Sequence, residues 1–341
     1  VVDGPVAQNE ICYISTGGDR LMAEVIKVVG TQVYVQVFES TRGLKVGAEA
    51  EFTGHMLEVT LGPGMLSKNY DGLQNDLDKM DGVFLKRGQY TYPLDKESKW
   101  HFVPLAKAGD QVEAAAWLGQ VDENFQPLKI MVPFGQKGVC TVKSIVKEGD
   151  YGIEDTIAVL TDEEGNDVKV NMIQKWPVKR AMTNYKEKPR PFKLLETGVR
   201  VIDTVNPIVE GGTGFIPGPF GTGKTVLQHA ISKQAEADIV IIAACGERAN
   251  EVVEIFTEFP ELVDPHTGRK LMERTIIIAN TSNMPVAARE ASVYTAMTIG
   301  EYYRAMGMKV LLLADSTSRW AQALREMSNR MEELPGQDAF P

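Results

Sequence analysis

The chain has 341 residues, with 36 basic and 46 acidic side chains and a formal net charge of −10. This length is too great for one average domain and suits two or three. The acidic balance argues against a protein that wraps nucleic acid, because neutralising phosphates requires clustered Lys and Arg. The longest apolar runs have about seven residues, far fewer than the ~20 that span a bilayer, so any membrane role is expected to be peripheral.

The three cysteines, Cys12, Cys140 and Cys245, are far apart and odd in number. They lack the paired spacing of a disulfide framework or a zinc site, so a reducing cytosol is the simplest setting. The chain opens with "VVDGPVAQNE", without an initiator Met or a signal peptide, and closes with "GQDAFP" just after the last predicted helix. We therefore expect a piece of a longer protein.

Residues 1–60 contain short β-rich runs at intervals of about ten residues, including "ICYIS", "MAEVIKVV", "QVYVQVFE" and "HMLEVTL". In "TQVYVQVFES" polar and apolar residues alternate, which is typical of a half-buried strand. This spacing predicts a small N-terminal β-barrel, complete or incomplete. Residues 61–102 break the pattern with glycines and a proline and are expected to form a junction.

Residues 103–176 form a second β-rich block with a faint internal similarity between "AKAGDQVEAAAWLGQV" and "VKEGDYGIEDTIAVL". The two hairpin-like halves resemble the small sandwich of biotinyl and lipoyl carriers. A carrier needs an exposed Lys at a hairpin tip, whereas Lys129 is expected just before a strand. We therefore favour a structural or interaction module over a covalent cofactor carrier.

Residues 177–341 begin with a proline-rich, basic connector and then alternate between apolar strands and amphipathic helices. This alternation predicts a parallel sheet that is buried on both faces by helices. The predicted strands are 214–217, 239–245, 275–281 and 310–314, and the predicted helices are 224–236, 250–259, 285–306 and 317–333.

The stretch "GPFGTGKT" has Gly218, four further residues and then Gly223-Lys224-Thr225, the spacing of a phosphate-binding loop that opens a helix. The glycines let backbone amides approach phosphate oxygens at the helix N-terminus. Lys224 supplies a charge for the β- and γ-phosphates, and the Thr225 hydroxyl is placed for Mg²⁺. The predicted nucleotide-binding residues are Gly218, Pro219, Phe220, Gly221, Thr222, Gly223, Lys224, Thr225 and Val226.

Asp315 ends the apolar run "KVLLLAD", where a carboxylate at the tip of a strand reaches a Mg²⁺ shell. The alternative role for Asp315 is the N-cap of the following helix.

Glu247 follows Gly246 directly after another apolar run, and a carboxylate there can orient a water for attack on the γ-phosphate. The neighbouring Arg248 is expected to contact the γ-phosphate or to fix Glu247 by an ion pair. The alternative is an ordinary charged start of a surface helix for both residues, because acidic side chains are common in the first turn.

Four long motifs together resemble the catalytic A subunit of the archaeal and vacuolar (A/V-type) rotary ATPases. The motifs are "GPFGTGKT", "CGERANEVVEIFTEFPEL", "LMERTIIIANTSNMPVAAREASVYTAMTIGEYYRAMG" and "LLLADSTSRWAQALREMSNRMEELPG". The resemblance implies an N-terminal β-barrel, a β-rich bulge insert and a RecA-like P-loop parallel α/β core. The block at 103–176 is similar to the bulge that distinguishes this subunit from its F-type and B-type relatives.

The resemblance also implies a function: ATP hydrolysis or synthesis coupled to H⁺ or Na⁺ transport, with ATP or ADP and Mg²⁺ as cofactors. By analogy, Lys224 and Thr225 bind phosphate and Mg²⁺, Glu247 positions the attacking water, Arg248 assists at the γ-phosphate and Asp315 completes the Mg²⁺ shell. The implied partners are B subunits in an alternating A3B3 ring and the central and peripheral stalks, at the cytoplasmic face of the plasma membrane. Nucleic acid is not expected as a partner.

Three alternatives share this core: a non-catalytic nucleotide-binding ring subunit, an export ATPase and a Rho-like helicase. The bulge block and the acidic balance count against the last two. One departure from the family pattern is Thr222, where prokaryotic relatives usually have Ala and eukaryotic ones a redox-sensitive Cys. Thr is small enough to keep the backbone path of the loop, so we expect activity without a thiol switch.

Overall fold

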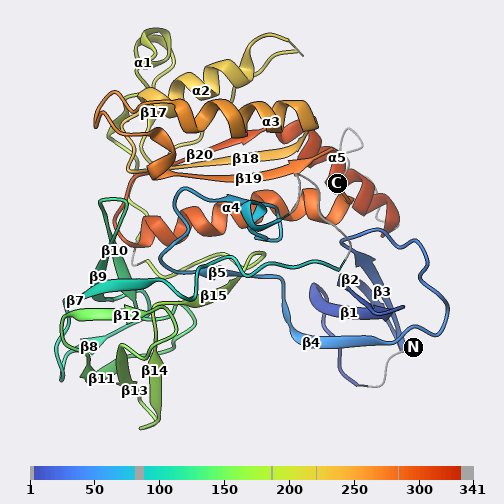
Figure 1. Cartoon of the computed structure of the whole chain (residues 1–341), viewed down its shortest axis with the longest axis horizontal. Coiled ribbons are helices and arrows are strands. Elements are labelled where there is room, and N and C mark those ends of the chain that lie inside the picture. Colours follow the sequence, from blue (N-terminus) through green and yellow to red (C-terminus); the bar gives the residue numbers. More distant parts are fainter. Residues whose placement is uncertain (1–3, 81–87, 186, 220, 283, 332–341) are drawn as a thin grey trace.

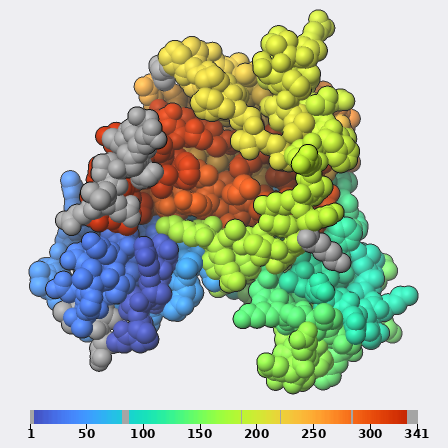
Figure 2. Space-filling model, turned by 180° about the vertical axis from the view of Figure 1, so that it is seen from behind, coloured from blue at the N-terminus to red at the C-terminus, as the bar shows by residue number. Residues whose placement is uncertain are grey.

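The computed structural model describes residues 4–80, 88–185, 187–219, 221–282 and 284–331. An α/β core carries two β-rich lobes on one side, the N-terminal sheet and the insert, and the surface is hollowed between them (Figures 1 and 2). In the part of the chain that is described, no helix is both long and apolar enough to cross a membrane.

The N-terminal lobe is one antiparallel sheet in the order β3-β2-β1-β4. Its alternating residues bury a small core of Cys12, Ile14, Leu21, Ala23 and Val37. The bounds are β1 (Glu10–Thr16), β2 (Asp19–Val29), β3 (Gln32–Val37) and β4 (Ala50–Met56). The last predicted barrel run does not stay in this sheet, because β5 (Glu58–Leu61) pairs with β15 (Gln174–Pro177) and buries Val59 and Leu61 in the central core.

The junction penetrates the core more deeply than expected. Its strand β6 (Asn69–Tyr70) pairs in parallel with β19 (Thr275–Thr281), and a 3₁₀ turn, η1 (Leu77–Lys79), follows. The chain between these elements is buried, including Asp71 and Asn75. A two-residue strand is too short to show a periodicity, so the sequence did not predict it.

The insert consists of two four-stranded sheets in the orders β10-β9-β7-β12 and β14-β13-β11-β8. Lys129 lies within β10 and not before it, because Leu128 and Ile130 alternate inward on either side of it. The β9–β10 turn is at Asn124 and Phe125, both with positive φ. The bounds are β7 (Lys99–Pro104), β8 (Gln111–Val112), β9 (Trp117–Glu123), β10 (Gln126–Met131), β11 (Cys140–Ile145), β12 (Gly149–Gly152), β13 (Ala158–Thr161) and β14 (Asp167–Val170).

The core is a parallel sheet in the order β20-β18-β19-β6, as the alternation of strands and helices predicts. β18 (Ile239–Glu247) is buried throughout, and its alternate residues contribute to two separate apolar clusters, one against α4 and one against α3. Figure 1 shows α2 and α3 on one side of the sheet and α4 on the other. The further bounds are β20 (Val310–Asp315), α2 (Lys224–Gln234), α3 (Ala249–Glu258), α4 (Val286–Ala305) and α5 (Thr317–Arg330), with 3₁₀ turns at Phe259–Glu261 and Leu271–Arg274.

The prediction of a strand at 214–217 is wrong. These residues have no regular secondary structure, and Phe215 is 79% exposed. A strand needs a neighbour for its backbone hydrogen bonds, and none of the described strands pairs with this segment. The preceding stretch holds only β16 (Leu194–Leu195), α1 (Arg200–Val205) and β17 (Ile208–Val209), and it covers the outer surface of the core in yellow-green in Figure 2.

Candidate nucleotide and metal site

The phosphate loop ends where α2 begins, at Lys224. Gly223 is the N-cap, with φ 83° and ψ 21°, a left-handed conformation that glycine adopts without strain. The cap makes no side-chain hydrogen bond to the helix. The first amides of α2 are therefore left for a ligand, and the positive end of the helix dipole favours an anion there.

The side chains of the loop bond to the loop itself. Lys224 Nζ donates to the carbonyl oxygens of Gly218 and Pro219, both at 2.8 Å, and Thr222 Oγ1 donates to the same Pro219 oxygen at 2.8 Å. Val226 is 73% exposed on the first turn of α2. Phe220, also predicted to bind nucleotide, lies outside the described residues.

Thr225 and Asp315 are brought together from the start of α2 and the end of β20. Thr225 Oγ1 donates to Asp315 Oδ2 at 2.6 Å, and Asp315 is only 7% exposed. A hydroxyl and a carboxylate are the hard oxygen donors that Mg²⁺ prefers, and Mg²⁺ in nucleotide sites usually keeps one or two protein ligands besides phosphate and water. The residues present therefore fit a Mg²⁺ ion. Among the described residues, no group of three His, Cys, Asp or Glu side chains forms a separate metal site.

Glu247 lies at the buried end of β18, where Gly246 turns the chain with φ 73°. Its carbonyl oxygen accepts a hydrogen bond from the Ser282 amide at 2.8 Å, which ties it to the end of β19. Burial and a hydrogen bond with Glu251 raise the pKa of Glu247 to about 8, against the opposing effect of a nearby guanidinium. The nucleotide-free structure thus favours the protonated form of this carboxyl group more than water does.

Arg319 is the functional side chain that the sequence interpretation missed. Its Nη1 lies 3.3 Å from Glu247 Oε2 and donates to the Gly246 carbonyl oxygen. Arg319 is the third residue of α5, four positions after Asp315, and no pattern in the sequence links it to Glu247. Arg248 lies beside Glu247 at the N-cap of α3 with its side chain exposed, so the ion pair to Glu247 that the structure shows comes from Arg319.

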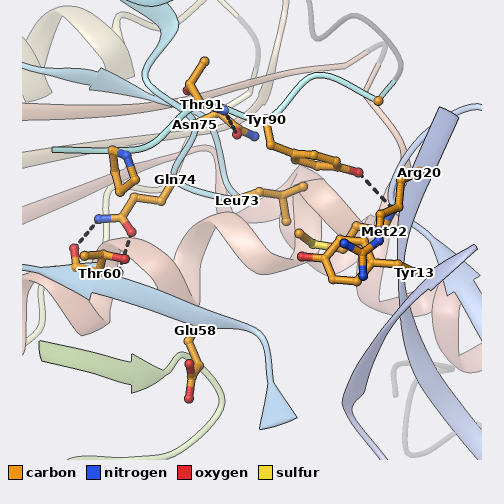
Figure 3. A pocket seen from close by; sticks show the side chains of 12 residues that line it. Tyr13, Arg20, Met22, Glu58, Thr60, Leu73, Gln74, Asn75, Tyr90 and Thr91 are labelled. Atoms are coloured by element: carbon orange, nitrogen blue, oxygen red, sulfur yellow. Dashed lines mark hydrogen bonds between the residues drawn. The ribbon is translucent and has the colours of Figure 1, made fainter. Parts of the chain in front are cut away.

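A cavity of about 300 Å³ lies elsewhere, between the N-terminal sheet and the junction (Figure 3). Its polar side chains bond to the protein: Gln74 pairs with the backbone amide and carbonyl of Thr60, both at 2.7 Å, and the Tyr90 hydroxyl accepts from the Met22 amide at 2.9 Å. None of the predicted site residues lines this cavity. The candidate site is therefore the carboxyl end of the core sheet, where parallel sheets bind ligands.

The comparisons with known proteins agree with one another. Three family models match: the ATP synthase alpha/beta family β-barrel domain at 1–54, the ATP synthase alpha/beta subunit barrel-sandwich domain at 91–179 and the ATP synthase alpha/beta family nucleotide-binding domain at 198–341.

The chain is also similar to proteins named V-type ATP synthase alpha chain. It is 58% identical to the one from Treponema denticola over 99% of this chain, and 57% and 56% identical to those from Borrelia hermsii and Borreliella afzelii over 100% of it. It spans 58–60% of the length of these relatives. With matching models in all three parts and this level of identity, the chain belongs to the ATP synthase alpha/beta family.

Proposed function

We propose that this chain is the nucleotide-binding part of the catalytic subunit of an A/V-type rotary ATP synthase or ATPase. The subunit hydrolyses or makes ATP, and the complex couples this reaction to transport of H⁺ or Na⁺. The names of the relatives and the match to a nucleotide-binding model support this function over the alternatives of an export ATPase or a Rho-like helicase.

The observation that carries the proposal is the position of Glu247 relative to the phosphate loop. β18 and β20 are adjacent and parallel with Ala244 opposite Asp315, so Glu247 and Asp315 lie at the same edge of the sheet. Asp315 in turn bonds Thr225 of the loop. A carboxyl group with a raised pKa beside a phosphate loop supports a catalytic role over that of a non-catalytic ring subunit.

In this function Thr225 and Asp315 would hold Mg²⁺, which supplies positive charge that offsets the charge of the phosphates. Lys224 binds the β- and γ-phosphates through its ammonium group. Glu247 accepts a hydrogen bond from the attacking water, Arg319 fixes the Glu247 carboxylate, and the exposed Arg248 reaches toward the γ-phosphate. The remaining loop residues, Gly218 to Gly223 and Val226, surround the nucleotide.

We further propose the assembly and the division of the chain. The A subunit alternates with B subunits in an A3B3 ring that is held by central and peripheral stalks on the cytoplasmic face of the membrane. B contributes an arginine finger, and because such fingers are worth ~10³ to 10⁵ in rate, this chain alone should be a poor ATPase. The proposed domains are the barrel at 1–60, the junction at 61–102, the insert at 103–176 and the core at 177–341.

The test is the substitution Glu247→Gln in the full-length subunit assembled with its partners. We expect ATP binding to be retained and turnover to fall at least about 100-fold, because the amide no longer accepts a proton from water. Glu254→Gln on the exposed side of α3 is the matched control and should leave turnover unchanged. Turnover that survives in Glu247→Gln would remove the catalytic role.

A further inference from the structure

The Pro219 carbonyl oxygen in the phosphate loop accepts two hydrogen bonds, from Lys224 Nζ and from Thr222 Oγ1, each at 2.8 Å. A carbonyl oxygen has two lone pairs, so these two donors fill it. The Lys224 ammonium has three donors and uses a second on the Gly218 carbonyl oxygen, also at 2.8 Å. Two of its three donors are thus engaged by the loop itself.

Lys224 must give up part of this bonding when its ammonium turns to a phosphate. The Pro219 carbonyl oxygen then keeps one donor, the Thr222 hydroxyl. A side chain without a hydroxyl at 222 would leave this oxygen dependent on Lys224 alone. Each departure of the ammonium would then exchange the remaining protein hydrogen bond of this exposed carbonyl for one to water.

The loop is shaped for this contact. A Cβ atom on Gly218 would lie 2.6 Å from Thr222 Oγ1, so the missing side chain at 218 is what allows the hydroxyl to lie across the loop. The stem of Lys224 passes over the same glycine, with its Cδ 3.9 Å from that Cβ position. Thr222 and Lys224 therefore approach the Gly218–Pro219 backbone side by side.

We propose that Thr222 is a positioning residue for Lys224: its hydroxyl keeps the Pro219 carbonyl bonded when Lys224 turns to phosphate and so favours nucleotide binding. Thr222 acts through the lysine and needs no contact with the nucleotide. The inference rests on the proposed nucleotide-binding function and adds a role for a side chain that differs from the family pattern.

The experiment measures MgADP binding by titration calorimetry to the full-length protein with Thr222, Thr222→Val and Thr222→Ser. Val keeps the branched shape without the hydroxyl, and Ser keeps the hydroxyl. One hydrogen bond is worth about 0.5–1.5 kcal/mol, so we expect the Kd of Thr222→Val to rise about 2- to 10-fold and that of Thr222→Ser to stay within about 2-fold. The thermal unfolding temperatures of the three proteins without nucleotide should lie close together, because Lys224 then still bonds to the exposed Pro219 carbonyl oxygen.

Two results would overturn the inference. One is equal Kd values for Thr222 and Thr222→Val. The other is an equal loss of affinity in Thr222→Ser and Thr222→Val, which would show that keeping the hydroxyl does not preserve binding. A different result would remove the proposed function itself. If the unaltered protein binds no MgADP, the function fails and this inference fails with it.

Discussion

The two halves of the candidate site are held in different ways. Glu247 and Asp315 are the buried last residues of two core strands, and other parts of the chain pack against this core. The phosphate loop instead follows an exposed segment and bonds mainly to itself. The difference indicates that the carboxylate side of the site is formed before a ligand arrives, while the Lys224 side rearranges on binding. The contacts that hold this part of the chain come from the N-terminal sheet, the insert and the junction. Each contact can be removed by a single substitution.

The largest effect is expected from Lys179→Met. Lys179 Nζ lies 2.9 Å from Glu24 Oε1 of β2 and 3.4 Å from Glu290 Oε2 of α4. It therefore joins the N-terminal sheet to α4, the helix that packs against the core sheet. The side chains of Glu24 and Glu290 are 2% and 5% exposed. Removing the lysine leaves two buried carboxylates together, which should cost about 3–5 kcal/mol in the free energy of unfolding.

Chemical denaturation measures this loss, and the exposed pair of Lys143 and Asp167 provides the control. Its side chains are 57% and 46% exposed, so Lys143→Met should cost less than about 1 kcal/mol. Equal losses of unfolding free energy in Lys179→Met and Lys143→Met would contradict a stabilising role for the contact between Lys179, Glu24 and Glu290.

The second effect concerns Glu123, at the tip of the β9–β10 hairpin of the insert. Its carboxylate accepts hydrogen bonds from the Gly64 and Leu66 amides of the junction, both at 2.8 Å. Burial raises the pKa of Glu123 from 4.5 to about 7. Between these pH values the folded chain keeps a proton that the unfolded chain has lost, so the free energy of unfolding should fall by roughly 3 kcal/mol as the pH rises from 4.5 to 7.

Glu123→Gln cannot titrate, so its unfolding free energy, measured by urea denaturation at a series of pH values, should depend less steeply on pH across this window. Glu254→Gln, on the exposed side of α3, should keep the slope of the unaltered chain. An unchanged slope in Glu123→Gln would show that the insert is not tied to the junction through this proton.

The third effect concerns Gly72, where the junction enters the core. A Cβ atom there would lie 2.6 Å from the Ala288 carbonyl oxygen of α4 and would also meet the Asn280 side chain at the end of β19. Gly72→Ala should therefore lower the free energy of unfolding by about 1–3 kcal/mol. Gly135→Ala is the matched control, because nothing lies within 4 Å of its Cβ position, and comparable thermal melts for the two variants would contradict the close approach.

Local patterns in the sequence predicted the strands and helices of the core because each is a continuous apolar run or an amphipathic stretch. β18 and β19 are buried at every position and needed no knowledge of their neighbours. The prediction of a strand at 214–217 was wrong because a strand needs a neighbouring strand to pair with, and a run of four residues does not specify one. β6 was missed because two residues have no period.

The same distinction applies to the site. Lys224, Thr225, Glu247 and Asp315 stand at fixed offsets from their own strands and helices, so the sequence was sufficient to single them out as candidates. Arg319 reaches Glu247 only because α5 folds back toward the end of β18, and Lys179 meets Glu24 across 155 positions of chain. Contacts of this kind depend on the packing of distant segments, which no local pattern contains.

The central claim is that Thr225 and Asp315 form one metal-binding edge with the phosphate loop. The most direct measurement compares ATP binding with and without Mg²⁺ in the full-length protein and in Asp315→Asn. We predict that Mg²⁺ strengthens binding to the unaltered protein and that Asp315→Asn loses this increment while keeping its Mg²⁺-free affinity, because an amide is a weaker ligand than a carboxylate. An Asp315→Asn protein that gains as much from Mg²⁺ as the unaltered one would contradict the claim.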